Sequence, residues 1–334
     1  MLVDLRLKNT ATFWNTEMQP LRTVLQSVSV GEAEACEMQL LIVLTLAAAA
    51  AAMPAYDTEG GMLALYYANA VKCDPDRVKD WRCGPACERA GPLHDVTMVY
   101  NDSYRVRGFA GYDPVRDRVV LSFRATSNAI NWIENLDFQL VNYTTHPQCG
   151  AGCKVHKGFY ETYSFMALTL MPAVKAMLLA HPGAGLMVTG HSLGAAQAQL
   201  ALVDVLMTDD AEGAGRRAVT AINFGCPRVG NPAFADWGEA MINASPAVAM
   251  YRIVHADDPV PMVPFTSMGF QHFPREFIWY DRTLAAPGWT YCNATGVQAA
   301  VSDTAPACGA SSFFQANNTA HLYYLGVHMD CHLQ

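Results

Sequence analysis

A serine between two glycines is the first feature of this chain that could do chemistry. Gly190, Ser192 and Gly194 fit the pattern G-x-S-x-G, in which a sharp turn between a strand and a helix lifts a serine hydroxyl above the edge of a sheet. Glycines relieve backbone crowding at such a turn. An apolar run from Leu186 precedes the serine, and a run of helix-forming residues from Leu193 follows it, as the pattern requires. We therefore predict that Ser192 is a nucleophile for acyl transfer.

The partners of such a serine are a base and an acid. A serine hydroxyl attacks an ester when a nearby base accepts its proton and a carboxylate orients that base. After a turn of this kind, the acid comes first in the chain and the histidine second. Asp257 and Asp258 directly follow an apolar run at Met250–Val254, and two prolines stiffen the loop after them. We choose Asp258 and keep Asp257 as the alternative, because spacing does not decide between neighbours.

Four histidines obey this order and compete for the role of the base. They are His272, His321, His328 and His332. A histidine in a polar loop is ordinarily just solvated, so order alone does not separate the four. The tetrahedral intermediate also needs donors for its oxyanion, and the backbone N–H of Leu193, directly after the serine, is the expected first donor.

The elements that must position these residues alternate between strands and helices. Short apolar runs predict buried strands at 115–124, 186–190, 219–224 and 250–254, and helical patterns cover 161–180 and 193–207. Such alternation implies a mostly parallel central sheet with helices on both faces. No repeat and no linker interrupts the chain after residue 55, so we expect a single domain at 53–334.

Residues 1–52 are expected to form a leader. Leu40–Leu46 is an apolar run, Ala47–Ala52 follows it, and this order is typical of a cleaved secretory signal. The run is too short to span a bilayer, which needs about 20 apolar residues. Met38 lies directly before the run, so translation from Met38, without residues 1–37, is an open alternative. We expect a secreted protein.

Composition excludes several classes of protein. The chain has 334 residues, of which 51% are hydrophobic and 16% charged, so it has ample material for a core. A net charge of -8 without a run of Lys or Arg argues against a nucleic-acid partner. Ten cysteines agree with export, and neither close pair, Cys83 with Cys87 or Cys149 with Cys153, is followed by histidine at zinc-finger spacing. We expect no metal, no cofactor and no obligate protein partner. The glycosylation sequons are Asn101, Asn142, Asn293 and Asn317.

Three segments together resemble the fungal-type (class 3) triacylglycerol lipases. They are residues 190–194, residues 223–231 with the sequence NFGCPRVGN, and residues 258–261 with the sequence DPVP. Residues 123–126 and 155–159 are also similar, and the similarity runs from about residue 64 to residue 331. The resemblance implies the α/β-hydrolase fold with a short helical lid. It also implies hydrolysis of acylglycerol esters, with the lipid substrate met at an oil–water or membrane interface.

The same resemblance assigns the remaining site residues. Asp258 matches the family's triad aspartate, and His321 matches its triad histidine within residues 320–326. Thr126 matches the residue that supplies the second oxyanion donor. Ala125 stands before it where the family often has glycine, which is a departure in this loop. We therefore predict a triad of Ser192, His321 and Asp258.

A short amphipathic segment follows Thr126. Ile130, Ile133 and Leu136 are spaced by three, and with Trp132 they resemble the apolar side of the family's lid. A surface helix that packs on the core is the alternative. The related feruloyl esterases have polar lids, so these residues favour a lipase. Phospholipase and galactolipase activity, and a catalytically inactive lipid-binding relative, stay open as alternatives.

The resemblance also implies a set of disulfides. The pairs are Cys73 with Cys331, Cys83 with Cys87, and Cys149 with Cys153. Cys292 and Cys308 are left over and form a fourth candidate pair. Cys226, just after a predicted strand, is expected to be an unpaired core thiol.

Overall fold

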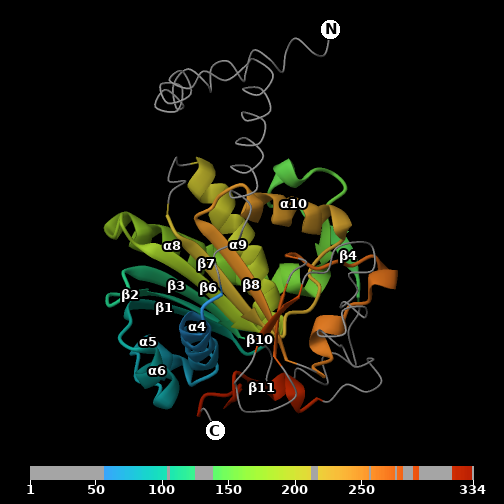
Figure 1. Cartoon of the computed structure of the whole chain (residues 1–334). Helices are drawn as coiled ribbons and strands as arrows, with labels where there is room; N and C mark the ends of the chain where they lie inside the picture. Colours follow the sequence, from blue (N-terminus) through green and yellow to red (C-terminus); the bar gives the residue numbers. More distant parts are fainter. Residues whose placement is uncertain are drawn as a thin grey trace, which may run out of the picture. The chain divides into compact units, whose positions relative to one another are not determined.

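The central sheet of the protein has eight strands in the order β1-β2-β3-β6-β7-β8-β9-β10 (Figure 1). The computed structural model describes residues 56–103, 106–124, 138–211, 217–255, 257–274, 277–280, 289–292 and 318–332, all within the compact unit 53–334. The strands of the sheet are β1 His94–Asn101, β2 Val106–Asp113, β3 Arg118–Arg124, β6 Gly185–His191, β7 Val219–Phe224, β8 Val248–His255, β9 Phe277–Tyr280 and β10 Trp289–Cys292.

The middle of this sheet is parallel, as predicted. Strands β3, β6, β7, β8 and β9 each run parallel to their neighbours in this group, whereas the pairs β1 with β2, β2 with β3, and β9 with β10 are antiparallel. In register, Phe123 lies beside Gly190, Gly190 beside Asn223, and Asn223 beside Arg252. The carboxyl ends of four strands therefore meet at one edge of the sheet, where ligands bind in open α/β sheets.

Helices cover both faces of the sheet, which confirms the predicted layers. Alternate residues of a strand point to opposite faces. In β3, Val119 and Leu121 join the core cluster formed with α8 and α9, whereas Val120 joins the cluster formed with α4. The described helices are α4 Thr58–Ala70, α5 Pro75–Lys79, α6 Pro85–Ala90, α8 Lys157–Ala180, α9 Leu193–Ala211 and α10 Pro232–Asn243.

Short elements complete the described part of the chain. Two small hairpins pair β4 with β5 and β11 with β12. Their bounds are β4 Leu140–Asn142, β5 Lys154–His156, β11 Tyr323–Tyr324 and β12 Val327–His328. The 3-10 helices are η1 Pro147–Cys149, η2 Val260–Met262, η3 Thr266–Met268 and η6 Ala320–Leu322.

Helix α8 is long and apolar enough to cross a membrane, and it is the one described helix of which this is true. Its buried side chains include Phe159, Tyr163, Met166 and Leu170, and the helix packs against β1, β2, β3 and α9. Core helices of soluble proteins share this composition. The inward side of α8 is therefore accounted for by its place on one face of the sheet, while Leu168 and Leu179 on the same helix are exposed.

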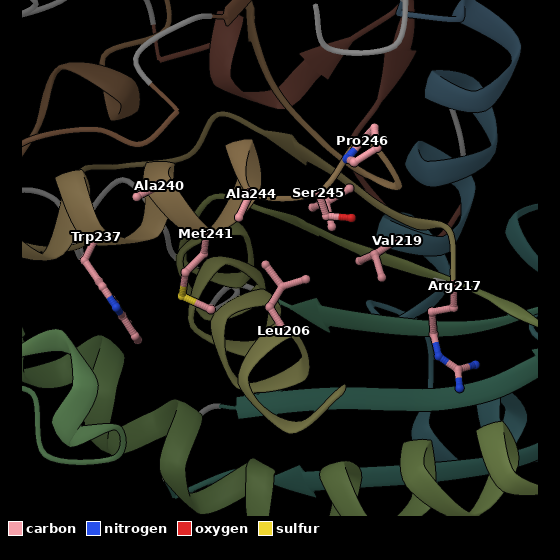
Figure 2. Close-up of a pocket in the computed structure, with 10 residues that line it drawn as sticks. Leu206, Arg217, Val219, Trp237, Ala240, Met241, Ala244, Ser245 and Pro246 are labelled. Carbon is pink, nitrogen blue, oxygen red and sulfur yellow. The ribbon is translucent and has the colours of Figure 1, made fainter. Parts of the chain in front are cut away.

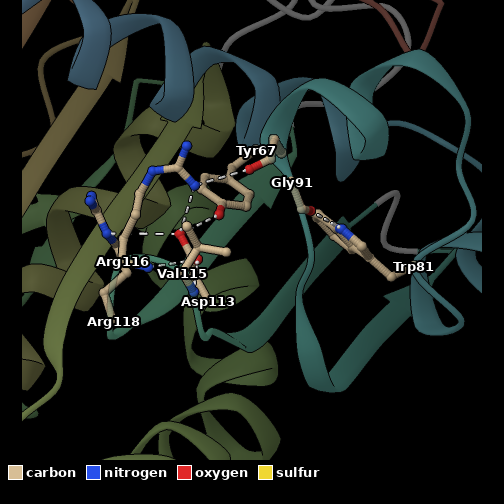
Figure 3. Close-up of polar contacts among 8 residues, drawn as sticks. Tyr67, Trp81, Gly91, Asp113, Val115, Arg116 and Arg118 are labelled. Carbon is tan, nitrogen blue, oxygen red and sulfur yellow. Dashed lines mark hydrogen bonds and ion pairs between the residues drawn. The ribbon is translucent and has the colours of Figure 1, made fainter.

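A buried carboxylate fastens α4 to the β2–β3 hairpin (Figure 3). The side chain of Asp113 is fully buried and accepts hydrogen bonds from the Tyr67 hydroxyl at 3.1 Å and from the Arg116 guanidinium at 3.2 Å. Its other oxygen accepts from the backbone of Val115 at 3.0 Å. Burial and the nearby Asp113 charge raise the pKa of Tyr67, which keeps this donor protonated. Helix α4 is thereby fixed against the β2–β3 hairpin.

Three disulfides that the resemblance implies are present. They join Cys73 to Cys331, Cys83 to Cys87, and Cys149 to Cys153. Cys292 is also disulfide-bonded, while Cys308 lies outside the described residues. Cys226 is a buried free thiol, and burial raises its pKa to about 12. The first disulfide ties the end of α4 to the end of the described chain.

Candidate active site

Ser192 occupies a strained turn at the centre of the sheet edge. Strand β6 ends at His191, helix α9 begins at Leu193, and the serine between them has φ 60°. A non-glycine residue in this left-handed region is uncommon and strained, and such residues cluster at functional sites. The backbone N–H of Ser192 donates to the carbonyl of Phe224 at 2.9 Å, which holds the turn against β7.

The two glycines of the motif are required by close backbone contacts. A Cβ atom on Gly190 would lie 2.3 Å from the carbonyl oxygen of Gly194, and a Cβ on Gly194 would lie 2.3 Å from that of Phe123. Real side chains do not approach backbone this closely. The G-x-S-x-G spacing is thus explained by a helix start that packs directly on β3 and β6.

Asp258 and His321 form a buried hydrogen-bonded pair. Asp258 follows β8, His321 lies in η6, and both side chains are fully buried. The Nδ1 atom of His321 lies 3.0 Å and 2.9 Å from the two carboxylate oxygens. Because a carboxylate is an acceptor, Nδ1 carries the hydrogen and Nε2 keeps its lone pair. The neighbouring Asp257 has φ 68° and lies in the turn between β8 and Asp258.

Tyr324 is a further partner of the pair that the sequence did not single out for a role. Its hydroxyl donates to Oδ2 of Asp258, and the backbone N–H of Val260 donates to Oδ1 at 2.8 Å. Burial and the Asp258 charge raise the pKa of Tyr324 well above its ordinary value, so the hydroxyl keeps its proton. The sequence does contain a signal for this tyrosine. Tyr324 lies within segment 320–326, three residues after His321, and belongs to the next strand.

The other histidines of the predicted set point to other partners. Nε2 of His272 lies 2.8 Å from the carbonyl of Pro261, and burial lowers the pKa of this histidine well below its ordinary value. His328 bonds Asp330, and His332 is exposed. Of the four, His321 alone is described in contact with Asp258.

Gly225 lies close to the segments that carry Ser192, Asp258 and His321. It follows β7 with φ 56°, and a Cβ atom there would lie 2.7 Å from Oδ2 of Asp258 and 3.1 Å from Cε1 of His321. The carbonyl just before it, that of Phe224, accepts from Ser192. Within the described residues, Ser192 Oγ and His321 Nε2 are buried without a hydrogen-bond partner. The two atoms do not bond each other. What joins the two segments is Gly225, which follows the carbonyl that accepts from Ser192 and lies against Asp258 and His321.

Of the two predicted oxyanion donors, Leu193 lies within the described residues and Thr126 lies outside them. Leu193 is the first residue of α9, where backbone N–H groups have no acceptor inside the helix. The helix dipole also favours negative charge at this end. The remaining predicted residues of the oxyanion loop and lid lie outside the described residues: Thr126, Ile130, Trp132, Ile133 and Leu136.

A cavity of about 500 Å³ lies at the opposite edge of the sheet (Figure 2). Val219 and Val248, which line it, are the first residues of β7 and β8, whereas Gly225 and Asp258 follow the carboxyl ends of these strands. The cavity is therefore separate from the serine corner. No group of three or more His, Cys, Asp or Glu side chains within the described ranges could hold a metal ion.

Comparison with known proteins agrees with this architecture. Residues 120–268 match the family described as "Lipase (class 3)". "Secreted mono- and diacylglycerol lipase 1" of Fusarium solani is 32% identical over 225 residues, which cover 65% of this chain and 62% of that protein. "Secreted mono- and diacylglycerol lipase A" of Penicillium cyclopium is 32% identical over 196 residues, 58% of each chain. The chain thus matches about three fifths of the length of these curated relatives.

Solved structures extend the comparison to the fold. Lipase II from Rhizopus niveus superposes with a TM-score of 0.66 at 26% identity, and the match covers 83% of this chain and 98% of that one. The α/β-hydrolase fold expected from the sequence is confirmed by this match and by the observed sheet order. The matched segment 120–268, the relatives and the fold agree with one another, and all three make the chain similar to the fungal-type class 3 lipases.

Proposed function

We propose that this protein is a secreted serine carboxylester hydrolase that cleaves acylglycerols. The observation that carries the proposal is the corner built from Ser192, His321 and Asp258. Ser192 is strained and buried, and the residue before it, His191, stacks on the buried imidazole of His321, whose Nδ1 is held by a carboxylate and whose Nε2 keeps a lone pair. This is the chemical arrangement of a serine triad.

The proposed reaction has two steps. His321 accepts the proton of Ser192 as the hydroxyl attacks the ester carbonyl, and it then gives the proton to the leaving alcohol. Water cleaves the acyl-enzyme in the second step, with His321 again as the base. Asp258 stabilises the imidazolium that forms in each step. The N–H of Leu193 and the predicted donor Thr126 would stabilise the oxyanion.

The comparisons support acylglycerols as the substrate class. The relatives from Fusarium solani and Penicillium cyclopium are named as secreted lipases of mono- and diacylglycerol. A solved structure that matches with a TM-score of 0.66 at 26% identity is titled as a triacylglycerol lipase whose catalytic centre is a serine protease triad. These names belong to the other proteins, and they favour an acylglycerol lipase over a feruloyl esterase for this chain.

Secretion and interfacial activation complete the proposal. The apolar run before Ala52 and the disulfides at Cys73, Cys83 and Cys149 support export. The apolar spacing of Ile130, Ile133 and Leu136 supports a lid that opens on lipid. We keep residues 1–52 as the proposed leader and 53–334 as the mature domain.

Hydrolysis of tributyrin, followed below and above its solubility limit, tests the proposal. We expect tributyrin to be cleaved, with a jump in rate when droplets appear, and methyl ferulate to be cleaved slowly. Ser192→Ala is the control for contaminating esterases and should be inactive on both. Preference for methyl ferulate would move the assignment to a feruloyl esterase, and inactivity of the wild type on every ester would leave a lipid-binding relative.

A further inference from the structure

The residue directly before the serine contacts the proposed base. His191 is buried, and its ring stacks on that of His321 with centroids 4.4 Å apart and planes inclined by 29°. Its Nε2 lies 2.8 Å from the backbone carbonyl oxygen of His321. Because that oxygen only accepts, Nε2 of His191 carries a hydrogen and donates it. His191 therefore fixes both the ring plane and the backbone of His321.

A lysine from α4's end supplies the donor for the other nitrogen of His191. Nζ of Lys72 lies 3.3 Å from Nδ1 of His191, and it also donates to the carbonyl of Met329. With its hydrogen on Nε2, a neutral His191 has a lone pair on Nδ1 and accepts from the lysine. Burial, together with the Lys72 charge, lowers the pKa of His191 well below its ordinary value, which favours this neutral form.

Other contacts hold the same segment independently of the lysine. Nδ2 of Asn69 donates to the carbonyl of His328 at 3.2 Å, and Cys73 is bridged to Cys331. On the far side, Nδ1 of His255 lies 2.9 Å from the carbonyl oxygen of Ala320. The segment that carries His321 is thus fastened at several points, and loss of the lysine contact alone leaves these links in place.

We infer that Lys72 and His191 are positioning residues for His321, linked as a hydrogen-bond relay from the Lys72 amine through the His191 ring to the backbone of His321. The inference rests on the proposed function, in which His321 is the base. Neither residue touches the reacting atoms in this role. The relay holds the imidazole in the plane from which Nε2 meets the serine, and geometry of this kind contributes to rate because small misplacements of a base are costly.

The charges around the relay keep it intact through neutral pH. Burial and the Arg124 cation lower the pKa of Lys72 to about 7, and Asp330 opposes this shift. His328 is a further titratable group that lowers the pKa of His191. Lys72 therefore changes from ammonium to amine near neutrality, and both forms carry N–H groups that can donate to His191.

Two substitutions at position 72 distinguish a positioning role of Lys72 from a purely structural one. Lys72→Met keeps most of the length of the side chain and removes the donor, whereas Lys72→Gln keeps a donor on a side chain one atom shorter. We expect Lys72→Met to lower kcat on soluble p-nitrophenyl butyrate about tenfold at unchanged KM, as expected for the loss of a positioning contact. Lys72→Gln should recover most of that loss. Lys79→Met, which removes an exposed lysine at the end of α5, is the matched control and should behave as wild type.

His191→Phe is the second test, because it keeps a stacked ring and removes both hydrogen bonds. It should also lower kcat about tenfold at unchanged KM. Wild-type kcat in Lys72→Met or in His191→Phe would overturn the relay. So would equal loss in Lys72→Met and Lys72→Gln with lowered melting temperatures, which would mean a structural role. Failure of the wild type to cleave any ester, or full activity of Ser192→Ala, would instead overturn the proposed function.

Discussion

The Nδ1 atom of His321 lies 2.9 Å and 3.0 Å from the two carboxylate oxygens of Asp258. This contact brings together residues 63 positions apart in the sequence. It leaves Nε2 as the nitrogen that can accept a proton, because Nδ1 is the donor to the carboxylate. Sequence spacing left open whether Asp257 or Asp258 is the partner of the histidine, and these distances favour Asp258.

Substitution of the two aspartates separately tests this pair. Asp258→Asn offers His321 an amide that can force the wrong tautomer, so kcat should fall by about 10³-fold to 10⁴-fold. Asp257→Asn should keep near wild-type activity, because Asn tolerates the left-handed backbone at φ 68° and the hydrogen bonds of His321 go to Asp258. The measurement is kcat on a soluble ester for both variants. Greater loss in Asp257→Asn would reverse the assignment.

Tyr324→Phe removes one of the donors to Asp258 and keeps the aromatic ring. Hydrogen bonds to charged groups contribute roughly 1.5 to 3 kcal/mol, so kcat should fall about tenfold or more. Tyr323→Phe is the control, since the Tyr323 ring contacts His328 on the neighbouring strand. Equal activity of Tyr324→Phe and Tyr323→Phe would show that the Tyr324 hydroxyl has no part in orienting the acid.

Gly225→Ala places a methyl group between the acid and the base. The new Cβ would lie 2.7 Å from Oδ2 of Asp258, and a displaced base costs about a hundredfold in rate. Gly269→Ala is a matched control, because Gly269 has φ 84° but its nearest neighbour is a Leu140 methyl at 3.7 Å. Both variants should lose stability through backbone strain of about 1 to 3 kcal/mol. Activity of the folded protein should fall in Gly225→Ala alone.

The disulfides should differ in how much they stabilise the fold. Cys73–Cys331 closes a loop of 258 residues and Cys83–Cys87 one of 4. Loop-closure entropy assigns about 5.5 kcal/mol to the first and about 2 kcal/mol to the second. Urea denaturation of the two double Cys→Ala variants measures this difference. A larger loss on removal of Cys83–Cys87 would contradict the expectation.

Lys72 should make stability depend on pH. The unfolded chain keeps a proton on Lys72 up to its ordinary pKa of 10.5, whereas the folded chain releases it near pH 7. The unfolded state therefore binds more protons in this window, and the Lys72 contribution to the free energy of unfolding rises with pH. From pH 7 to pH 9, wild type should gain stability relative to Lys72→Met in urea denaturation. Lys79→Met should follow wild type, and parallel curves for wild type and Lys72→Met would contradict the expectation.

Much of the parallel centre of the fold could be predicted from the sequence. The run 219–224 is strand β7 with the same bounds, and the predicted helix 161–180 lies within α8. Buried parallel strands are continuous apolar runs, which makes them visible in sequence. Strand β1 was not predicted, because its residues are mostly half-exposed and mix polar with apolar side chains.

The serine turn was also predictable, whereas the surroundings of the base were not. The glycines beside Ser192 are fixed by local backbone contacts, so their spacing is a sequence signal. The contact between Lys72 and His191 joins residues 119 positions apart, and that between Tyr324 and Asp258 joins residues 66 apart. Such contacts leave no signal in the local sequence, because they form only when distant segments come together at the edge of the sheet.

Covalent labelling tests the central claim most directly. The mature protein is treated with a fluorophosphonate probe, digested, and the modified peptide is identified by mass spectrometry. We predict that the label is found on Ser192, that Ser192→Ala abolishes it, and that His321→Ala slows it strongly because the serine loses its base. Persistent labelling of Ser192→Ala, or a label on another residue of the wild type, would contradict the account.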